Sequence, residues 1–566
     1  MKHWRLNLFL LLFFILAAII ISRLFYLQIL ESKFYKSQAL GQQVGFQEIK
    51  GSRGEIFFGN SNVSNKIKTL ATSEERWIMF AVPEQIEDKN NFSEVLIKEI
   101  KETIKPNSGL TKNSIISKLD KDSSYVVIEK DLSIKDIENV KKLKLEGLHL
   151  ERVQSRYYPE KNLSSQVIGF LGGDNIGQYG VEGYYEEILK GKTGIKEEKK
   201  GLDSIDYQDI SFLNGSDIFL TIDYNIQFEA ESLLREARKN IDIDSGQIIV
   251  IKPDSGKILA LANFPSFDPN EYSSVKDFEI FQNATTQKIF EPGSVLKPFT
   301  MAVALNEGKI SPENKFEDTG SVKIGPDTIY NFDRKKYGEQ DMSGIVEKSI
   351  NTGAVYLSQL VSRQTFLDYI DKFGFNQKTN IELQGENYSS NETLKKSVGT
   401  IGIATASFGQ GIEMTPMQLV KAFSVFANKG KIVKPYIVEK IVHGEEEQKT
   451  KPEISQNIIS EKTASQVTTM MINVVERGFG SGAKINGYYL AGKTGTAQIP
   501  LKDKKGYYQD KTIQSFIGFG PALNPQFLIL VKLDNPKVSG SALSAAPIFK
   551  KLSQYIINYL QIPPDY

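Results

Sequence analysis

The chain has 566 residues, of which 40% are hydrophobic and 24% are charged, and its formal net charge is +1 at pH 7. This length exceeds what one hydrophobic core supports, so we expect two to four folded units, and the composition excludes a disordered protein. The near-zero charge gives no electrostatic footprint for nucleic acid, so we exclude a nucleic-acid partner.

Two residue types are scarce, and their scarcity limits the possible chemistry. The chain contains no cysteine, which excludes thiol catalysis, disulfides and cysteine-ligated metals. Its three histidines, His3, His149 and His443, are isolated from one another and are more typical of surface residues than of a catalytic base. A nucleophilic serine in this chain therefore needs activation by a lysine or a carboxylate. We expect no metal ion and no cofactor.

The N-terminal segment Leu6–Ile21 is apolar except for Asn7, and Arg23 comes directly after it. The run is slightly shorter than the roughly 20 residues that span a bilayer, and snorkelling of Arg23 extends it. The alternative is a cleaved signal peptide, but no small-x-small site succeeds the run. We predict that residues 1–27 form a short cytoplasmic tail and a single transmembrane anchor. Lysines lie on both sides of the span, so the charges alone indicate its orientation only weakly.

The next stretch, up to about residue 216, mixes short β-type runs with charged helical patterns. Residues 124–128 read as a strand and 136–144 as a polar helix, while glycines punctuate a loop before a helical run at 184–189. No combination of side chains here has the pattern of a catalytic site. Alone, this part indicates a structural or interaction module.

From residue 217 onward, strands occur at both ends of the sequence and helices lie between them. We predict strands at 218–222, 246–253, 257–262, 487–497, 515–519 and 527–533, and helices at 224–239 and 546–560. Residues 444–452 read as a charged loop, most simply the solvent-exposed tip of a hairpin. The pattern predicts one antiparallel sheet assembled from distant segments, with a helical lobe beside it.

The first motif that can carry chemistry is the run EPGSVLKP at residues 291–298. Pro-Gly ends the preceding structure and an apolar helical pattern comes next, which places Ser294 at a helix N-terminus. Ser294 and Lys297 share one helical face, so the lysine amine can reach the serine hydroxyl. The helix start also offers N–H groups and a positive field to a developing oxyanion. For this motif alone, an N-capping serine beside a surface lysine is the simpler alternative.

Two further motifs offer polar groups. The run SIN at 349–351 precedes a predicted helix at 354–361, and an ordinary polar loop with an N-cap is the alternative. The run KTGT at 493–496 lies on a predicted strand, where a glycine often marks the close approach of another backbone or a ligand. A peptide can add to such a strand edge. An edge strand guarded by a charge and a glycine has the same pattern.

Ser-x-x-Lys, Ser-x-Asn and Lys-Thr-Gly occur here in the order that is the signature of penicillin-binding proteins and class A β-lactamases. Over nearly its whole length the chain resembles the class B penicillin-binding proteins, which are monofunctional peptidoglycan D,D-transpeptidases. The similarity includes the runs RYYP at 156–159, GVEG at 180–183, LTID at 220–223 and FGQGI at 408–412. Two positions depart from the pattern: Ile350 replaces the aspartate of Ser-Asp-Asn, and Gln166 stands where relatives commonly have histidine.

The resemblance implies an α+β protein with a single N-terminal transmembrane helix, an elongated mixed α/β pedestal and a penicillin-binding transpeptidase domain. That last domain is expected to be β-lactamase-like, with an antiparallel five-stranded sheet flanked by helices and an all-helical lobe. The expected boundaries are 1–27 for the tail and anchor, 28–216 for the pedestal (the dimerisation domain) and 217–566 for the transpeptidase domain. The catalytic domain is then extracytoplasmic.

The resemblance also implies the residues of the site. The expected catalytic residues are Ser294, Lys297, Ser349 and Asn351, and the expected substrate-binding residues are Lys493, Thr494, Gly495 and Thr496. Ser294 is expected to attack the penultimate D-alanine of a D-Ala-D-Ala stem peptide, with Lys297 as base and the N–H groups of Ser294 and Thr496 as oxyanion hole. An amine from a neighbouring strand then resolves the acyl-enzyme, and β-lactams acylate the same serine. Which group is the acylation base stays open.

The further expected partners are the cytoplasmic membrane, a SEDS-family glycan polymerase and divisome proteins. They are expected because the glycine-rich stretch before residue 183 and the compact loops favour the division-type branch over the elongation-type branch. Three alternatives remain: a β-lactamase or β-lactam sensor on the same fold, an inactive scaffold, and a carboxypeptidase. The long pedestal argues against the first and the intact motifs argue against the second, whereas the sequence does not decide the third.

Overall fold

The computed structural model describes residues 45–59, 67–100, 110–120, 125–132, 134–198, 213–396, 401–501 and 506–566. The predicted anchor at 6–21 lies outside these ranges. Within them, none of the helices has the length and apolar character that crossing a membrane requires. The chain divides into two compact units, Met1–Arg53 with Lys190–Ser216, and Gly54–Leu189 with Asp217–Tyr566. In the first unit, strand β1 (Gly45–Lys50) pairs antiparallel with β8 (Thr193–Glu198).

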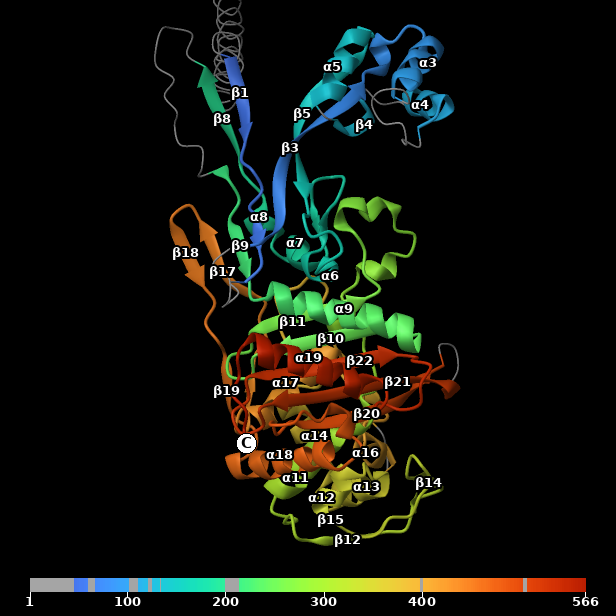
Figure 1. Cartoon of the computed structure of the whole chain (residues 1–566), viewed down its shortest axis with the longest axis vertical. Coiled ribbons are helices and arrows are strands. Elements are labelled where there is room, and N and C mark those ends of the chain that lie inside the picture. Colours follow the sequence, from blue (N-terminus) through green and yellow to red (C-terminus); the bar gives the residue numbers. More distant parts are fainter. Residues whose placement is uncertain are drawn as a thin grey trace, which may run out of the picture. The chain divides into compact units, whose positions relative to one another are not determined.

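The second unit contains the predicted five-stranded antiparallel sheet, whose strand order is β11-β10-β22-β21-β20 (Figure 1). Its strands come from two segments that are more than 200 residues apart in the chain: β10 (Ser245–Ile251), β11 (Ile258–Phe264), β20 (Ala491–Pro500), β21 (Tyr507–Gly520) and β22 (Phe527–Asp534). The two strands β10 and β22 are buried along almost their whole length because helices cover both faces of the sheet. The prediction of one sheet from distant segments is confirmed.

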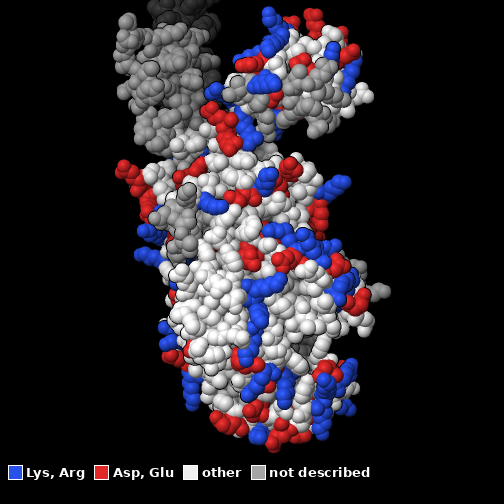
Figure 2. Space-filling view, in the orientation of Figure 1, with Lys and Arg blue, Asp and Glu red and all other residues white. Residues whose placement is uncertain are grey.

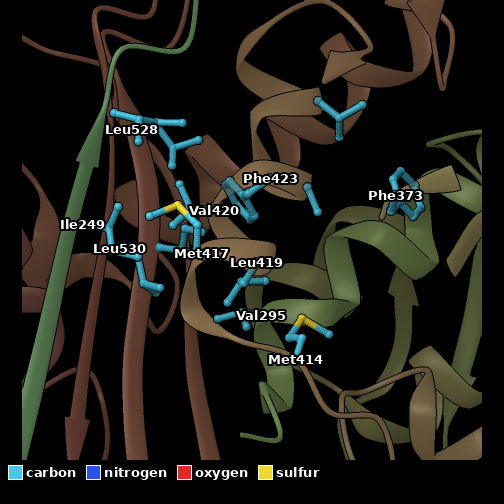
Figure 3. Packing of buried hydrophobic residues seen from close by; sticks show 14 of the residues in the cluster. Ile249, Val295, Phe373, Met414, Met417, Leu419, Val420, Phe423, Leu528 and Leu530 are labelled. Atoms are coloured by element: carbon cyan, nitrogen blue, oxygen red, sulfur yellow. The ribbon is translucent and has the colours of Figure 1, made fainter. Parts of the chain in front are cut away.

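Side-chain alternation along these strands separates the two cores. Ile248 and Val250 of β10 face a layer formed by α9 (Tyr224–Ile241) and α19 (Ala545–Tyr559). Ile249 faces the opposite layer, which α11 (Lys297–Asn306), α17 (Pro416–Ala427) and α18 (Glu461–Glu476) form. Figure 3 shows this second core, where Ile249, Leu528 and Leu530 of the sheet lie opposite Met417, Val420 and Phe423 of α17.

A lobe beside the sheet carries helices α12 (Met342–Glu347), α13 (Asn351–Gln359), α14 (Arg363–Lys372), α15 (Glu392–Lys396) and α16 (Ile401–Ala406). The prediction that this lobe is all-helical is wrong. It also contains the antiparallel pairs β12–β15 (Lys315–Asp318 with Gly338–Asp341) and β13–β14 (Ser321–Ile324 with Asp327–Tyr330). Each strand has only four residues and little apolar alternation, so the sequence does not predict it. The pairing of these strands depends on the surrounding fold.

A second sheet, ordered β18-β17-β9-β2-β3-β4 with β5 also on β3, lies outside the five-stranded sheet. It comprises β2 (Ile56–Phe57), β3 (Thr69–Ala81), β4 (Val126–Leu132), β5 (Leu148–Tyr157), β9 (Asp217–Leu220), β17 (Val438–His443) and β18 (Glu446–Lys449). The strand predicted at 218–222 forms, but β9 pairs in parallel with β2 and not with the five-stranded sheet. The hairpin predicted at 444–452 forms, because β18 pairs antiparallel with β17, but the stretch is partly strand where a loop was expected.

Shorter elements complete the second unit. Helices α3 (Lys89–Glu99), α4 (Lys112–Leu119) and α5 (Ile134–Leu143) belong with β4 to a separate small core. The remaining elements are α6 (Ser165–Ile168), α7 (Gly180–Tyr184), α8 (Glu186–Leu189), α10 (Ala284–Gln287), β6 (Phe170–Leu171), β7 (Gly177–Gln178), β16 (Lys431–Val433), β19 (Ile454–Asn457), η2 (Pro83–Gln85), η5 (Pro269–Ser274), η6 (Phe278–Phe281), η7 (Gly293–Leu296) and η8 (Ser481–Ala483). On the face drawn in Figure 2, cationic and anionic side chains are interspersed, in keeping with the small net charge.

Candidate active site

The candidate nucleophile lies in the short 3₁₀ turn η7, which leads directly into α11. The N–H of Lys297 donates to the carbonyl of Ser294, so the two residues stand one turn apart, as the sequence predicts. Val295 and Leu296 between them are fully buried, and Val295 points into the core seen in Figure 3. The core thereby fixes the backbone on which the Ser294 hydroxyl is carried. Pro298 sits in the first turn of α11, where its missing N–H costs least.

Two backbone segments contact this turn closely. Gly293 donates its N–H to the carbonyl of Gly409 at 3.0 Å. A Cβ on Gly293, whose φ is +61°, would lie 2.7 Å from the carbonyl oxygen of Thr496, and a Cβ on Gly409 would lie 2.1 Å from that of Gly293. Only glycine permits such close backbone contact at these two positions. The turn is therefore held between the 408–412 loop and strand β20.

Strand β20 forms an edge of the five-stranded sheet and carries the KTGT run against the turn. A Cβ on Gly495 would lie 2.9 Å both from the carbonyl oxygen of Pro292 and from Cγ1 of Val295. The glycine therefore marks the close approach of another backbone, which confirms that prediction. As a result, the nucleophile turn and the edge of β20 are neighbours.

Lys297 extends from α11 into a buried position and is only 1% exposed. Its Nζ donates to Ser349 Oγ at 3.1 Å, to Asn351 Oδ1 at 2.7 Å and to the carbonyl oxygen of Ser349. Ser349 adopts a left-handed conformation with φ of +55°, which is uncommon for a residue with a side chain and often occurs at functional sites. The first two motifs therefore meet at the amine of Lys297.

Lys493 reaches the same point from the sheet. It is completely buried, and its Nζ donates to Ser349 Oγ at 3.0 Å and to Thr494 at 3.1 Å (carbonyl) and 3.2 Å (Oγ1). The alternative of an edge strand guarded by a charge requires an exposed lysine, whereas the structure directs this amine inward. All three motifs thus converge on the hydroxyl of Ser349.

This convergence changes the acid–base properties of both amines. Burial, and then the nearby charge of Lys493, hold the pKa of Lys297 well below its usual value of 10.5. Burial alone lowers the pKa of Lys493 to about 7. A buried amine loses hydration that its charged form needs, and a second ammonium nearby repels the proton. The lowered pKa favours the neutral form of the Lys297 amine, which is the form that can accept a proton.

One residue that the sequence did not indicate supports β20 from the loop after β22. Ser541, which is 2% exposed, donates its hydroxyl to the carbonyl of Gly495 and lies 3.0 Å from Thr496 Oγ1. No motif marks this serine, because its partners are 45 and 46 residues away in the chain. It links the KTGT run to the neighbouring loop.

Glu291, three residues before Ser294, is a second residue without a predicted role. Its carboxylate accepts the N–H of Gly411 at 3.0 Å and the hydroxyl of Tyr507 at 3.1 Å. Burial raises its pKa, and the charge of Glu413 adds to the increase, while these two hydrogen bonds oppose it. Tyr507, the first residue of β21, thereby contacts the segment that leads to Ser294.

Within the described part of the chain, no three His, Asp or Glu side chains are arranged so as to hold a metal ion. The two described histidines lie elsewhere: His149 contacts Gln85 Oε1 at 2.7 Å, and His443 ends β17. The site therefore consists of two serines, two lysines, an asparagine and the edge of a strand. This set can carry acyl transfer by a lysine-activated serine.

Comparison with known families agrees with this geometry. Residues 246–554, more than half of the chain, match the penicillin-binding protein transpeptidase domain. The chain belongs to this family. Residues 48–203 match the penicillin-binding protein dimerisation domain, so the family's two-domain arrangement is present.

Individual relatives support the same assignment along nearly the full length. The chain is 32% identical to stage V sporulation protein D of Bacillus subtilis, with 98% of this chain and 86% of the relative covered. It is 28% identical to peptidoglycan D,D-transpeptidase FtsI of Escherichia coli, with 97% and 90% covered. The crystal structure of penicillin-binding protein 3 from Mycobacterium tuberculosis complexed with aztreonam has the same fold, at a TM-score of 0.69 and 24% identity over 92% of this chain and 98% of that one.

Proposed function

We propose that this chain is a peptidoglycan D,D-transpeptidase that cross-links stem peptides through an acyl-enzyme on Ser294. The Ser294 hydroxyl attacks the carbonyl of the penultimate D-alanine, the terminal D-alanine leaves, and an amine from a neighbouring strand takes the acyl group. A β-lactam acylates the same oxygen, but its acyl group is not transferred onward to an acceptor amine. The reaction requires a base, and the depressed pKa of the Lys297 amine favours its neutral, basic form.

The arrangement of hydrogen bonds supports a proton path. Lys297 takes the proton of Ser294 and, through Ser349 Oγ, which contacts both lysines, passes it toward the departing amine. Asn351 Oδ1 accepts a hydrogen bond from the Lys297 amine, and Asn351 orients the substrate amide. Since Lys493 contacts the same hydroxyl, its charge lowers the pKa of Lys297 further and makes the proton on Lys297 easier to release.

The edge of β20 is the proposed substrate platform. The stem peptide lies along this edge as an added strand. Thr494, Gly495 and Thr496 with Lys493 bind the terminal carboxylate, and the N–H groups of Ser294 and Thr496 receive the oxyanion. The close contact of Gly293 with the carbonyl of Thr496 supports this geometry, since it brings the two segments that carry these N–H groups together.

The single observation that carries the proposal is the buried Lys297 amine bonded to Ser349 and Asn351, one turn from Ser294. The test is mass spectrometry of the protein after incubation with penicillin. Wild type should gain the mass of one penicillin on the peptide containing Ser294, and Ser294→Ala should gain none. Ser362→Ala is the matched control because Ser362 caps α14 through the N–H of Thr365 and has no place in the site. A drug adduct that survives in Ser294→Ala contradicts the proposal.

Two other activities on this fold differ from transpeptidation in the fate of the acyl-enzyme. A β-lactamase hydrolyses the adduct rapidly, whereas a transpeptidase holds it for hours. A carboxypeptidase transfers the donor peptide to water, and a transpeptidase transfers it to an added acceptor strand. Product analysis with a pentapeptide donor and an amine-bearing acceptor should yield the cross-linked dimer. Release of D-alanine without dimer would assign the carboxypeptidase activity.

We further propose that residues 6–21 anchor the chain in the cytoplasmic membrane with the catalytic domain outside, and that it works in division with a SEDS-family polymerase and divisome proteins. The match to FtsI over 97% of the chain supports the division-type branch over the elongation-type branch. A functional fluorescent fusion should concentrate at the division site. Uniform labelling of the lateral wall would favour the elongation-type role.

A further inference from the structure

A buried carboxylate lies behind the candidate site without belonging to any of the three motifs. Asp318, at the end of β12, is completely buried. It accepts four hydrogen bonds: from the Thr352 hydroxyl (2.6 Å), from Asn331 Nδ2 (2.8 Å), from the N–H of Tyr337 (2.8 Å) and from the N–H of Gly320 (3.0 Å). All of these partners within the described chain are uncharged. Burying a carboxylate costs free energy unless hydrogen bonds compensate for the lost hydration, so we expect Asp318 to have a role beyond packing.

Asn331 connects this carboxylate to the second motif. Because its Nδ2 donates to Asp318, its Oδ1 is fixed on the other side, where it accepts the N–H of Asn351 at 3.0 Å and that of Thr352 at 3.3 Å. These are the first N–H groups of α13, and the residue before them, Ile350, provides no side-chain cap. Asn331 therefore caps α13 from another part of the chain.

The side chain of Asn351 is oriented by the same hairpin. Its Nδ2 donates to the carbonyl of Tyr330 at 2.9 Å, which leaves Oδ1 facing the Lys297 amine at 2.7 Å. Tyr330 thus holds the carboxamide of Asn351 and Asn331 holds its backbone N–H, while Asp318 in turn holds Asn331. A continuous chain of hydrogen bonds runs from Asp318 through Asn331 and Asn351 to Lys297.

We propose that Asp318 is a positioning residue for acylation, which acts through Asn331 on the orientation of Asn351. The inference rests on the proposed function and deepens it. With Asp318 in place, Asn351 presents an oxygen to the Lys297 amine. Without it, Asn331 Nδ2 keeps only its bond to the carbonyl of Lys335 at 2.9 Å, so the amide that caps α13 is held less firmly. The Asn351 amide can then turn its NH2 group toward the amine.

Asp318→Asn is the sharpest substitution because it keeps the shape and removes one acceptor. In either orientation, the new NH2 group faces a backbone N–H, that of Tyr337 or that of Gly320, so at least one bond is lost. The matched control is Glu386→Gln. Glu386 also accepts bonds only from uncharged groups, the N–H and hydroxyl of Thr379 and the N–H of Asn380, in a segment that carries none of the site residues.

The experiment measures the rate constant of acylation and the dissociation constant of the preceding complex with a fluorescent penicillin. For Asp318→Asn we expect the rate constant to fall about 10- to 100-fold, since small misplacement of catalytic groups has effects of this size. The dissociation constant should stay within about threefold, and the drug should still be attached to Ser294. Glu386→Gln should acylate at the wild-type rate.

A double-mutant cycle separates positioning from general destabilisation. If Asp318 acts through Asn351, the double variant Asp318→Asn/Asn351→Ala acylates as fast as Asn351→Ala alone. Losses that multiply, or a wild-type rate for Asp318→Asn, overturn the inference while leaving the proposed function intact. Should Asp318→Asn fail to fold, Asn331→Ala applies the same criteria, because it removes the connecting amide and leaves three of the bonds to Asp318. An unreactive wild type would instead contradict the proposed function.

Discussion

The amines of Lys297 and Lys493 donate to one and the same oxygen, Ser349 Oγ, at 3.1 and 3.0 Å. Both lysines are buried, so two full positive charges at this spacing would repel strongly. The site avoids this by lowering both pKa values. The charge of Lys493 therefore influences the protonation of Lys297, and this effect gives the site measurable pH behaviour.

Removal of Lys493 should shift the pH dependence of acylation. Burial is the main cause of the low pKa of Lys297 and the charge of Lys493 is the second, so in Lys493→Ala the pKa of Lys297 rises. The acidic limb of the acylation rate then moves to higher pH, and the loss in rate is larger at pH 6 than at pH 9. Stopped-flow acylation by a fluorescent penicillin between pH 5 and 9 measures this shift. An acidic limb at the wild-type position would show that Lys493 does not act on Lys297.

Lys297 should also reduce the stability of the fold at neutral pH. The pKa of Lys297 in the folded state is well below the usual 10.5. At pH values between the folded-state pKa and 10.5, the unfolded chain therefore binds a proton that the folded chain does not. The free energy of unfolding of the wild type therefore rises with pH across this window. Lys297→Met, which has similar length and no charge, should be more stable than wild type at pH 7, and the difference should shrink at pH 9.5. Urea denaturation at the two pH values checks this, and acylation should be abolished. A constant difference between the curves would mean that Lys297 is charged in the fold.

Local sequence patterns predicted the elements well but not their partners. The hydrophobic runs of β10 and β22 specify buried strands, and the order of the three motifs indicates one site. Alternation in 218–222 predicts a strand but contains no information on its neighbour, and β9 in fact joins β2. The burial of Lys493 was not predictable for the same reason: the local sequence does not show which segments pack against a strand, and a lysine on a strand is ordinarily exposed.

The supporting residues were beyond sequence reasoning for a related reason. Asp318 and Thr352 are 34 residues apart, and Ser541 and Gly495 are 46 apart. Such hydrogen bonds depend on the tertiary fold and leave no periodicity in the chain. The family resemblance supplied the candidate site residues, whereas the groups that contact them from other parts of the chain became visible only in the structure.

Glu231 should make stability fall with rising pH. This residue of α9 is 4% exposed and accepts the N–H of Ser164 at 2.7 Å and Gln227 Nε2 at 2.9 Å. Burial raises its pKa to about 7. The folded state thus retains a proton that the unfolded state loses above about 4.5, so this contribution to stability is present below pH 4.5 and is lost as pH rises through 7. Relative to wild type, Glu231→Gln should gain in melting temperature between pH 5 and pH 8, because its carboxamide never ionises.

Glu236→Gln on the same helix is the control for this measurement. The Glu236 side chain is half exposed and contacts Lys551 at 2.9 Å on the surface, so its melting temperature should follow that of wild type at both pH values. If Glu231→Gln follows wild type as well, Glu231 is ionised throughout this range.

The ion pair between Arg156 and Glu182 should be essential for the part of the fold around β5 and α7. Arg156 Nε lies 2.7 Å from Glu182 Oε1 and Nη1 donates to the carbonyl of Gly54 at 2.8 Å, and the two side chains are 3% and 0% exposed. Removing one partner of a buried ion pair is strongly destabilising, so Arg156→Met should cost about 3–5 kcal/mol. Arg152→Met is the matched control from the same strand: its pair with Glu75, at 3.3 Å, has side chains that are 64% and 68% exposed, and its loss should cost less than about 1 kcal/mol. Urea denaturation compares the two, and equal losses would show that the buried pair contributes no more than a surface contact.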